Sequence, residues 1–304
     1  MPLTKQIYTS RMIAETSIQE RQEPIIYSEN TPPVALDQNQ IDFYQDKGFL
    51  FIENFFSPDE VKQFNLETKR LLDSKEITDS DYTFTEVGTD IVRSIFSMQN
   101  FSQIFDYLSR DQRILDIVHY LLGDRVYIHQ SRINFKPGFS GSGFYWHSDF
   151  ETWHIEDGMP NMRALSAMIS LTENTEYNGP LMVIPGSHKQ FVGCAGETPK
   201  DHYKESLKEQ RYGLPDEASL TQLVEAGGLV TIKSSPGSIV FFDCNLIHGS
   251  NNNISPHSRV NIFFVYNSVQ NTLQETVGGL KPRPEFVAAR KNIAPLEPIS
   301  PNHQ

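Results

Sequence analysis

From Val126 onward the chain alternates short β-rich runs with turns that contain glycine and proline, and this pattern restricts the fold more than any other feature. The predicted strands span residues 126–136, 163–171, 181–184, 229–232, 238–242 and 260–266. Antiparallel strands at this spacing, with no helices between them, are typical of a double-stranded β-helix, the cupin-like jelly roll. We therefore expect a mainly β fold with flanking helices.

Three helices are predicted before this β-rich part. The first spans residues 36–47, with Asp37 as its N-cap and Gly48 after its end, and a short buried strand follows at residues 49–52. The run Ser57-Pro58-Asp59-Glu60 provides an N-cap, a proline in the first turn and a capping-box glutamate for a helix to about residue 72. The third helix is expected at residues 112–122, before Gly123.

The chain is expected to form one domain with two flanking segments. Residues 1–35 are polar and lack a sustained period, so they predict a loosely packed N-terminal arm. Residues 36–290 form the domain, whose jelly-roll core begins at about residue 126, and residues 291–304 form a C-terminal tail. The stretch 193–226 is charged and poor in β-formers, and we interpret it as an insertion or lid over the mouth of the barrel.

Composition excludes several classes of partner. The formal net charge is -12 and no long Lys/Arg cluster is present, which disfavours nucleic acid and anionic lipid as partners. No run reaches the roughly 20 apolar residues of a membrane span, and the first residues lack the apolar core of a signal peptide, so we expect a cytoplasmic protein. A small-molecule partner is expected, and a homodimer is compatible with the sequence.

Cysteine usage narrows the choice of metal ligands. Cys194 and Cys244 are the two cysteines of the chain, and they are far apart. This argues against a disulfide framework and against a metal site that needs several thiolates. Any metal must therefore be held by histidine and carboxylate side chains.

Three side chains form the candidate metal site. His147 and Asp149 stand two apart, and on a strand such residues point to the same face. His248 follows the apolar strand predicted at 238–242, where a jelly roll can return it to the same mouth. Two imidazoles and one carboxylate on one side of an iron leave positions open for a bidentate co-substrate and oxygen, as non-haem iron oxygenases require. These residues are the predicted catalytic ligands.

The part of the chain after His248 adds a second group of candidates. His-x-Asp alone arises easily by chance, but Arg259 comes eleven residues after His248 at the start of a predicted strand. Its guanidinium fork suits the distal carboxylate of a dicarboxylic keto acid, to which Ser250 can add a hydroxyl. A surface salt bridge is the alternative for Arg259.

The chain offers further histidines. His188 is an alternative third ligand, but no arginine follows it at a useful spacing. His154 and His257 are expected to be structural or solvated, and His119 lies on the helix predicted before Gly123.

Together, His147-x-Asp149, His248 and Arg259 resemble the pattern of the phytanoyl-CoA dioxygenase family, and residues 184–188 resemble a turn common there. Within that family, the run 144–160 resembles the signature of members that hydroxylate the compatible solute ectoine. The resemblance covers residues 36–290. It implies a jelly-roll enzyme that binds iron(II), 2-oxoglutarate and O2, and converts ectoine into 5-hydroxyectoine with release of succinate and CO2.

The resemblance also implies roles for residues around the metal. Lys136 resembles the family lysine that meets the co-substrate, although an ordinary strand-end lysine is its alternative, and Phe144 is expected in the same pocket. Ectoine is a small zwitterionic ring, so its pocket should combine hydrogen-bonding groups, a cation and aromatic faces. The candidate substrate residues are Gln130, Arg132, Thr152 and Trp153, with Phe242 and Phe263 as weaker candidates because barrel aromatics mostly pack.

Three other functions stay open at this point. A dioxygenase of the same family that acts on another small amino or imino acid would keep every iron and co-substrate residue. A non-catalytic jelly-roll binding protein would need neither an open metal face nor Arg259. A zinc hydrolase would need no anchor for a dicarboxylate.

Overall fold

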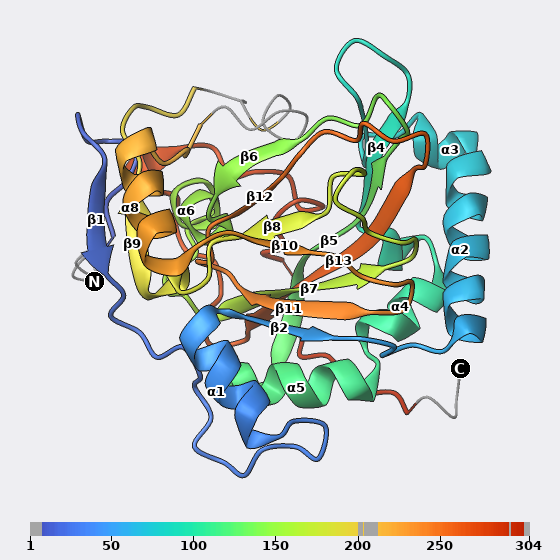
Figure 1. Ribbon diagram of the computed structural model, residues 1–304, viewed down its shortest axis with the longest axis horizontal. Coiled ribbons are helices and arrows are strands. Elements are labelled where there is room, and N and C mark those ends of the chain that lie inside the picture. The colour runs from blue at the N-terminus through green and yellow to red at the C-terminus, as the bar shows by residue number, and fades with distance from the viewer. Residues whose placement is uncertain (1–7, 200–202, 204–211, 292, 301–304) are drawn as a thin grey trace.

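The computed structural model describes residues 8–199, 203, 212–291 and 293–300, and its centre is formed by two antiparallel sheets (Figure 1). The larger sheet has the order β2 (Phe49–Ile52), β11 (Ile239–Asp243), β7 (Ala164–Ser170), β13 (Arg259–Ser268), β5 (Val126–Lys136), β4 (Val92–Phe96) and β3 (Thr83–Thr85). The smaller sheet has the order β10 (Val230–Ile232), β8 (Leu181–Val183), β12 (His248–Ser250) and β6 (Phe144–His147). The predicted double-stranded β-helix with flanking helices is confirmed.

The large sheet is buried on both faces. On β7, Ala167 and Ile169 join the core that the sheet shares with the outer helices, whereas Met168 joins the core between the two sheets. This follows from the alternation of side chains along a strand. The helices of the outer layer are α1 (Gln38–Lys47), α2 (Pro58–Asp73), α3 (Lys75–Thr78), α4 (Gln103–Ser109) and α5 (Gln112–Leu122), with the short turn η1 (Met98–Asn100). Figure 1 shows α1 and α5 along one side of the large sheet.

The predicted helix boundaries are confirmed closely. The N-cap Asp37 and Gln40 form a capping box for α1, and Gly48 follows the helix in the left-handed region. For α2, Ser57 and Glu60 form the same reciprocal pair. These local hydrogen bonds depend on neighbouring residues alone, so they can be predicted from a short window of sequence.

The six strands predicted from Val126 onward agree with the structure within two residues, and the strand predicted at 49–52 is β2, but several short strands were missed. They are β3, β4, β6, β12, β1 (Ser17–Glu20) and β9 (Gln190–Gly193). Segments of three to five residues carry too little alternation to be recognised without their pairing partners. The expectation that the β core begins at about residue 126 is also incomplete, because β3 and β4 extend the large sheet.

The prediction of a loosely packed N-terminal arm is wrong for the arm that the structure describes. Strand β1 pairs with β9, and the side chains of Tyr8 and Ser10 are fully buried. Arg21 donates from Nη1 to Asp243 Oδ2 at 2.8 Å. Figure 1 shows this part of the chain beside β9 and α8 (Glu217–Gly227). The sequence misled because polar residues with buried partners look the same as solvated ones.

The predicted insertion at 193–226 is described only in part. Its last portion is the helix α8, which begins after the N-cap Asp216 and packs Leu220 and Leu223 against Ile184 of the core. Residues 200–202 and 204–211 lie outside the described residues, so the lid there stays a prediction. The remaining short helices are α6 (Asp149–Thr152), η2 (Trp153–Asp157), η3 (Ser187–Lys189) and η4 (Val277–Gly279). No described helix is long and apolar enough to cross a membrane.

Candidate active site

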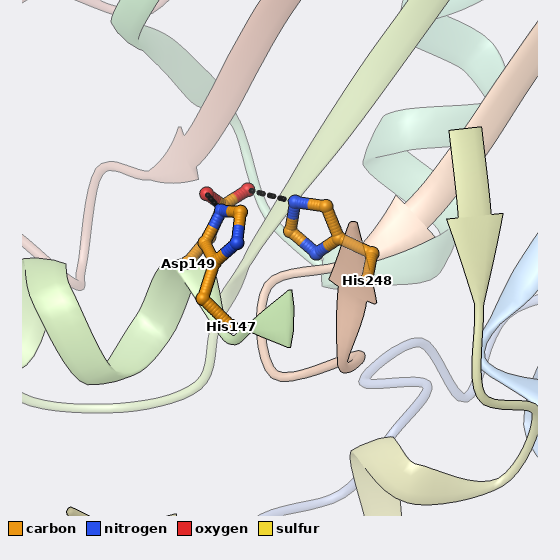
Figure 2. Close-up of side chains that lie close together, drawn as sticks. All are labelled: His147, Asp149 and His248. Atoms are coloured by element: carbon orange, nitrogen blue, oxygen red, sulfur yellow. Dashed lines mark ion pairs between the residues drawn. The ribbon is translucent and has the colours of Figure 1, made fainter. Parts of the chain in front are cut away.

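His147, Asp149 and His248 converge at the mouth of the jelly roll (Figure 2). His147 ends β6, His248 begins β12, and the two are direct partners in the antiparallel pairing of these strands. His147 Nε2 lies 3.8 Å from Asp149 Oδ1, and His248 Nε2 lies 3.9 Å from Asp149 Oδ2. One ligand atom from each residue lies within 4.8 Å of the other two. The predicted trio is therefore brought together.

Asp149 and His248 lie on other elements than the strands predicted for them. Asp149 does not share a strand with His147, because the chain turns at Ser148, the N-cap of α6, and Asp149 opens that helix. His248 does not end the strand at 239–243, because the chain leaves the large sheet there and His248 begins β12 in the small sheet. Asp149 is therefore placed by the start of a helix, and His248 by the passage of the chain from the large sheet to the small one. Alternation of side chains along one strand does not explain their position.

Both histidines are held in the tautomer that a metal needs. The carbonyl oxygens of Tyr145 and Leu246 can only accept, so Nδ1 of His147 donates at 2.7 Å and Nδ1 of His248 donates at 2.9 Å. The Nε2 lone pairs are therefore directed to the side of Asp149. Burial, and next the neighbouring His248, lower the pKa of His147 to about 4, so its ring is neutral at pH 7. Two imidazoles and one carboxylate fit iron(II) with open positions.

A group of buried cations lies next to the ligands. Arg259 begins β13 beside Lys136 of β5, and its Nη2 donates to Asn134 Oδ1 at 2.6 Å. Burial, and next the charges of Arg93 and Arg132, lower the pKa of Arg259 to about 9. The guanidinium therefore remains charged at pH 7 in a region of mutual cationic repulsion. Such a region favours the binding of an anion.

Lys136 reaches the same region through a hydroxyl. Its Nζ donates to Ser250 Oγ at 2.8 Å and to the carbonyl oxygen of Asn251. Burial, and next Arg259 and Arg93, lower the pKa of Lys136 to about 5. A neutral amine at this position becomes a cation when an anion comes close.

One cavity connects the metal ligands with Arg259. Its lining residues are Arg132, Asn134, Phe144, His147, Leu181, His248, Gly249, Ser250, Arg259 and Phe263. A wider groove of about 690 Å³ shares Phe144 and Ser250 with this cavity. The structure thus gathers two of the ligands, the proposed carboxylate anchors and two of the six candidate substrate residues around one space that adjoins a surface groove.

The other four candidate substrate residues lie outside the lining of this cavity. Gln130 Nε2 donates to the carbonyl oxygen of Val287 at 2.8 Å, and Thr152 Oγ1 accepts from Arg11. Trp153 is buried, with its ring centroid 5.1 Å from that of His129. The ring of Phe242 packs 5.0 Å from the ring of His248. Their contact with a substrate stays a prediction.

Sequence reasoning missed Asn134 and Arg93. Asn134 could have been found, because it stands between Arg132 and Lys136 at alternate positions of one predicted strand. Arg93 is buried, pairs with Glu86, and holds its guanidinium 4.1 Å from the ring centroid of Phe144. No motif signals Arg93, since a glutamate seven residues before an arginine is common and the ring that Arg93 contacts, Phe144, is distant in sequence.

The other candidate histidines lie outside the metal-ligand group. His188, the alternative third ligand, is buried, with Nε2 3.3 Å from the carbonyl oxygen of Gln45. His154 contacts the carbonyl oxygen of Met159 through Nδ1 at 2.7 Å. Among the described residues, the one group of three or more potential metal ligands is His147, Asp149 and His248.

Comparison with known families agrees with this geometry. The family model for phytanoyl-CoA dioxygenase (PhyH) matches residues 44–261, a span that contains the three ligands and Arg259. The chain belongs to the phytanoyl-CoA dioxygenase family. The resemblance noted from the motif residues is thereby confirmed.

Individual relatives of this family member are similar over nearly the whole chain. An ectoine dioxygenase of Bordetella bronchiseptica is 51% identical over 292 residues, which cover 96% of this chain and 95% of that protein. The crystal structure of EctD from S. alaskensis with 2-oxoglutarate and 5-hydroxyectoine superposes with a TM-score of 0.89 at 43% identity, covering 97% of this chain and 99% of that one. The structure of the same protein with bound Fe gives a TM-score of 0.86 at 42% identity and the same coverage.

Proposed function

We propose that this family member is an iron(II)- and 2-oxoglutarate-dependent ectoine hydroxylase. One observation carries the proposal: a single cavity is lined both by His147 and His248 of the metal-ligand group and by the charged, buried Arg259. The near full-length similarity to ectoine dioxygenases and to a structure with 2-oxoglutarate and 5-hydroxyectoine supports the choice of substrate.

The overall reaction balances without another reductant. Ectoine, 2-oxoglutarate and O2 give 5-hydroxyectoine, succinate and CO2, with one oxygen atom in the new hydroxyl and the other in succinate. Iron(II), when bound, supplies the centre at which the keto acid is chelated and O2 is reduced. His147, Asp149 and His248 would hold it through two Nε2 atoms and one carboxylate oxygen.

The residues around the cavity would orient the co-substrate. Arg259 would bind the distal carboxylate of 2-oxoglutarate, with Ser250 donating a further hydrogen bond and Lys136 supporting Ser250. Phe144 and Phe263 would exclude water beside the reacting carbon, which strengthens these electrostatic contacts.

The substrate residues form the second part of the proposal. Gln130, Arg132, Thr152 and Trp153 would surround the ectoine ring, with Phe242 and Phe263 as aromatic walls. Thr152 and Trp153 follow Asp149 directly on α6 and η2, so a ring held by them is close to the metal. This closeness is what positioning of an unactivated carbon for hydroxylation requires.

The test uses anaerobically purified protein supplied with iron(II), 2-oxoglutarate and ectoine, to which O2 is then added. We expect 5-hydroxyectoine and succinate in equal amounts, and no product when any one component is omitted. A protein inert on ectoine but active on another small imino acid would transfer the proposal to the same-family alternative. Zinc retained after metal analysis, with no iron-dependent turnover, would favour a hydrolase or a binding protein instead.

Location, assembly and domain organisation belong to the same proposal. We place the enzyme in the cytoplasm, as one domain over residues 36–290 with an arm before it and a tail after it. A homodimer stays an expectation, which light scattering of the purified protein tests directly.

A further inference from the structure

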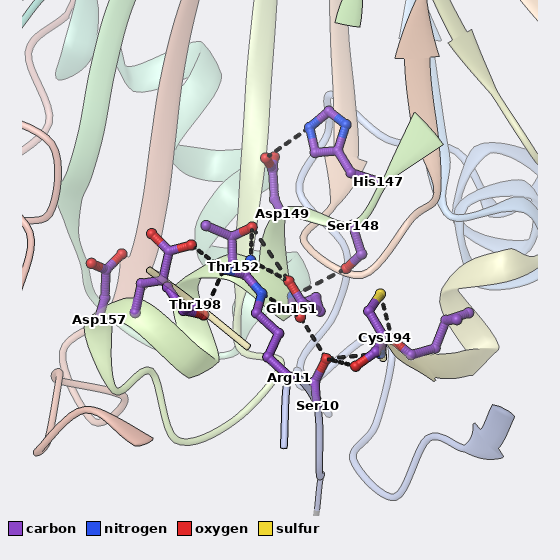
Figure 3. Close-up of polar contacts among 12 residues, drawn as sticks. Ser10, Arg11, His147, Ser148, Asp149, Glu151, Thr152, Asp157, Cys194 and Thr198 are labelled. Carbon is purple, nitrogen blue, oxygen red and sulfur yellow. Dashed lines mark hydrogen bonds and ion pairs between the residues drawn. The ribbon is translucent and has the colours of Figure 1, made fainter. Parts of the chain in front are cut away.

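The N-terminal arm contacts the segment that carries Asp149 at several points (Figure 3). The ring of Tyr8 packs edge-on against Phe150, with ring centroids 5.6 Å apart. Ser10 Oγ donates to Glu151 Oε1, and the backbone N–H of Arg11 donates to the carbonyl oxygen of Cys194 at 2.8 Å. The arm is therefore fixed both to α6 and to the chain after β9.

Arg11 is the centre of these contacts. Its Nε and Nη2 donate to the two carboxylate oxygens of Glu151 at 2.9 and 2.7 Å, and its Nη1 donates to Glu156 Oε1. The side chains of Arg11 and Glu151 are each 1% exposed. A bidentate pair with so little exposure has a defined geometry and cannot be replaced by water without movement of the chain.

The segment held by Arg11 has little stability of its own. Helix α6 has four residues, and the five residues of η2 that follow form a π-helical turn. Helices this short are marginal without tertiary contacts, and π-helical turns are frequent at functional sites. Because Asp149 is the first residue of α6 and Glu151 stands two residues later, displacement of Glu151 also displaces the metal ligand.

The backbone of Gly213 seals the ion pair from the other side. A Cβ atom at this position would come within 2.1 Å of Glu151 Oε2 and 2.4 Å of Arg11 Nη2. The pair is thus enclosed between the arm and the chain just before α8. This close approach is an observation independent of the hydrogen bonds.

We infer that Arg11 is a positioning residue for the active site, acting through Glu151 on Asp149 and directly on Thr152. Arg11 Nη2 donates to Thr152 Oγ1 at 3.1 Å, and this hydroxyl in turn donates to Glu151 Oε2 at 3.5 Å, so Arg11, Thr152 and Glu151 form one network. The effect on Thr152 rests on the proposed function, whereas the effect on Asp149 does not.

The test compares Arg11→Met, Arg11→Lys and Gly213→Ala with the wild type in two measurements. Anaerobic equilibrium dialysis gives the dissociation constant for iron(II). Turnover with ectoine, 2-oxoglutarate and O2 gives the ratio of succinate to hydroxyectoine. We expect Arg11→Met to weaken iron(II) binding by about 10- to 100-fold, the range known for residues that orient metal ligands. Succinate should then exceed hydroxyectoine. Arg11→Lys keeps the charge but loses the fork, so its effect should be smaller.

Two matched controls separate positioning from general destabilisation. Arg113→Met breaks ion pairs to Asp111 and Glu60 in the outer helical layer, and Gly88→Ala places a Cβ at nearly the same positive φ as at Gly213 but in open space. Both should keep wild-type iron binding and coupling even where the melting temperature falls. Should Arg11→Met fail to fold, Arg11→Lys and Gly213→Ala decide the question.

Two outcomes would overturn the inference. One is wild-type iron affinity and coupling in Arg11→Met; the other is equal losses in Arg113→Met at a similar melting temperature. A wild-type protein inactive on ectoine would remove the proposed function but not the test, because the iron(II) dissociation constant needs no substrate.

Discussion

His147 and His248 are register partners across the pair β6–β12, and each donates Nδ1–H to the carbonyl oxygen two residues before it in the chain. Their ring centroids are 4.4 Å apart. The two strands thus present equivalent imidazoles, with the same nitrogen free on each, toward one carboxylate. The backbone itself sets the tautomer, so no additional side chain is needed to orient either ring.

The first prediction follows from this arrangement. His147→Ala, Asp149→Ala and His248→Ala should each lose iron and turnover, because each removes one of three converging donors. Iron content after anaerobic reconstitution measures the effect, with His119→Ala, on α5 in the outer layer, as the histidine control. Full activity in His248→Ala would show that the third ligand has been misassigned.

The second prediction concerns Arg259. Arg259→Ala should raise the Michaelis constant for 2-oxoglutarate strongly, since a charged hydrogen bond to a carboxylate contributes about 1.5–3 kcal/mol. Iron content should stay near wild type, because Arg259 is not a ligand. Arg259→Lys keeps a positive charge but loses the guanidinium fork, so its Michaelis constant for 2-oxoglutarate should lie between those of the wild type and Arg259→Ala. Unchanged dependence on 2-oxoglutarate in Arg259→Ala would move the anchor elsewhere, with Lys136 as the next candidate.

Much of this architecture could be predicted because its causes are local. Strand β5 has eleven residues and its bounds agree with the prediction, and α1 and α2 are set by capping boxes within four residues of sequence. The motif His147-x-Asp149, taken together with His248 and Arg259, marks the metal site by residue type and spacing. The geometry behind it could not be predicted, because a one-turn helix such as α6 has no periodicity to detect.

The features that were missed depend on partners that the fold supplies. Arg11 and Arg93 look like solvated charges in the sequence, yet Arg11 is buried against Glu151, 140 residues away, and Arg93 is buried against Glu86, seven residues before it. Pairing across the structure, rather than composition, decides whether such a residue is buried. For the same reason the arm was expected to be loose, although its polar residues Ser10 and Arg11 are buried.

The third prediction uses the titration of Lys136. Because its pKa is lowered to about 5 in the free protein, the amine is neutral at pH 7. A carboxylate bound beside Ser250 favours the charged form and raises this pKa, so 2-oxoglutarate binding should take up a proton. The affinity must then fall as the pH rises from about 5 toward the pKa of the complex.

Calorimetric titrations in buffers of different ionisation enthalpy measure this proton uptake. Lys136→Met should bind 2-oxoglutarate more weakly and without proton uptake, while Arg259→Lys should keep the uptake. Equal proton uptake in Lys136→Met and in the wild type would assign the titrating group elsewhere.

The last prediction concerns Trp153, which is 3% exposed and packs in the same apolar cluster as Phe191. Replacement by alanine would leave a core cavity that costs about 3–5 kcal/mol, so a loss of activity could reflect lost stability instead of lost substrate contact.

Trp153→Phe is the better variant, since it keeps most of the side-chain volume. If the indole helps to hold ectoine, this variant should bind iron and 2-oxoglutarate normally but produce succinate in excess of hydroxyectoine. Phe191→Leu perturbs the same cluster at a residue whose ring packs against Tyr8 and Phe150, and it should keep the two products equal. Wild-type coupling in Trp153→Phe together with uncoupling in Phe191→Leu would mean that packing of the cluster, and not contact with the indole, controls the position of the substrate.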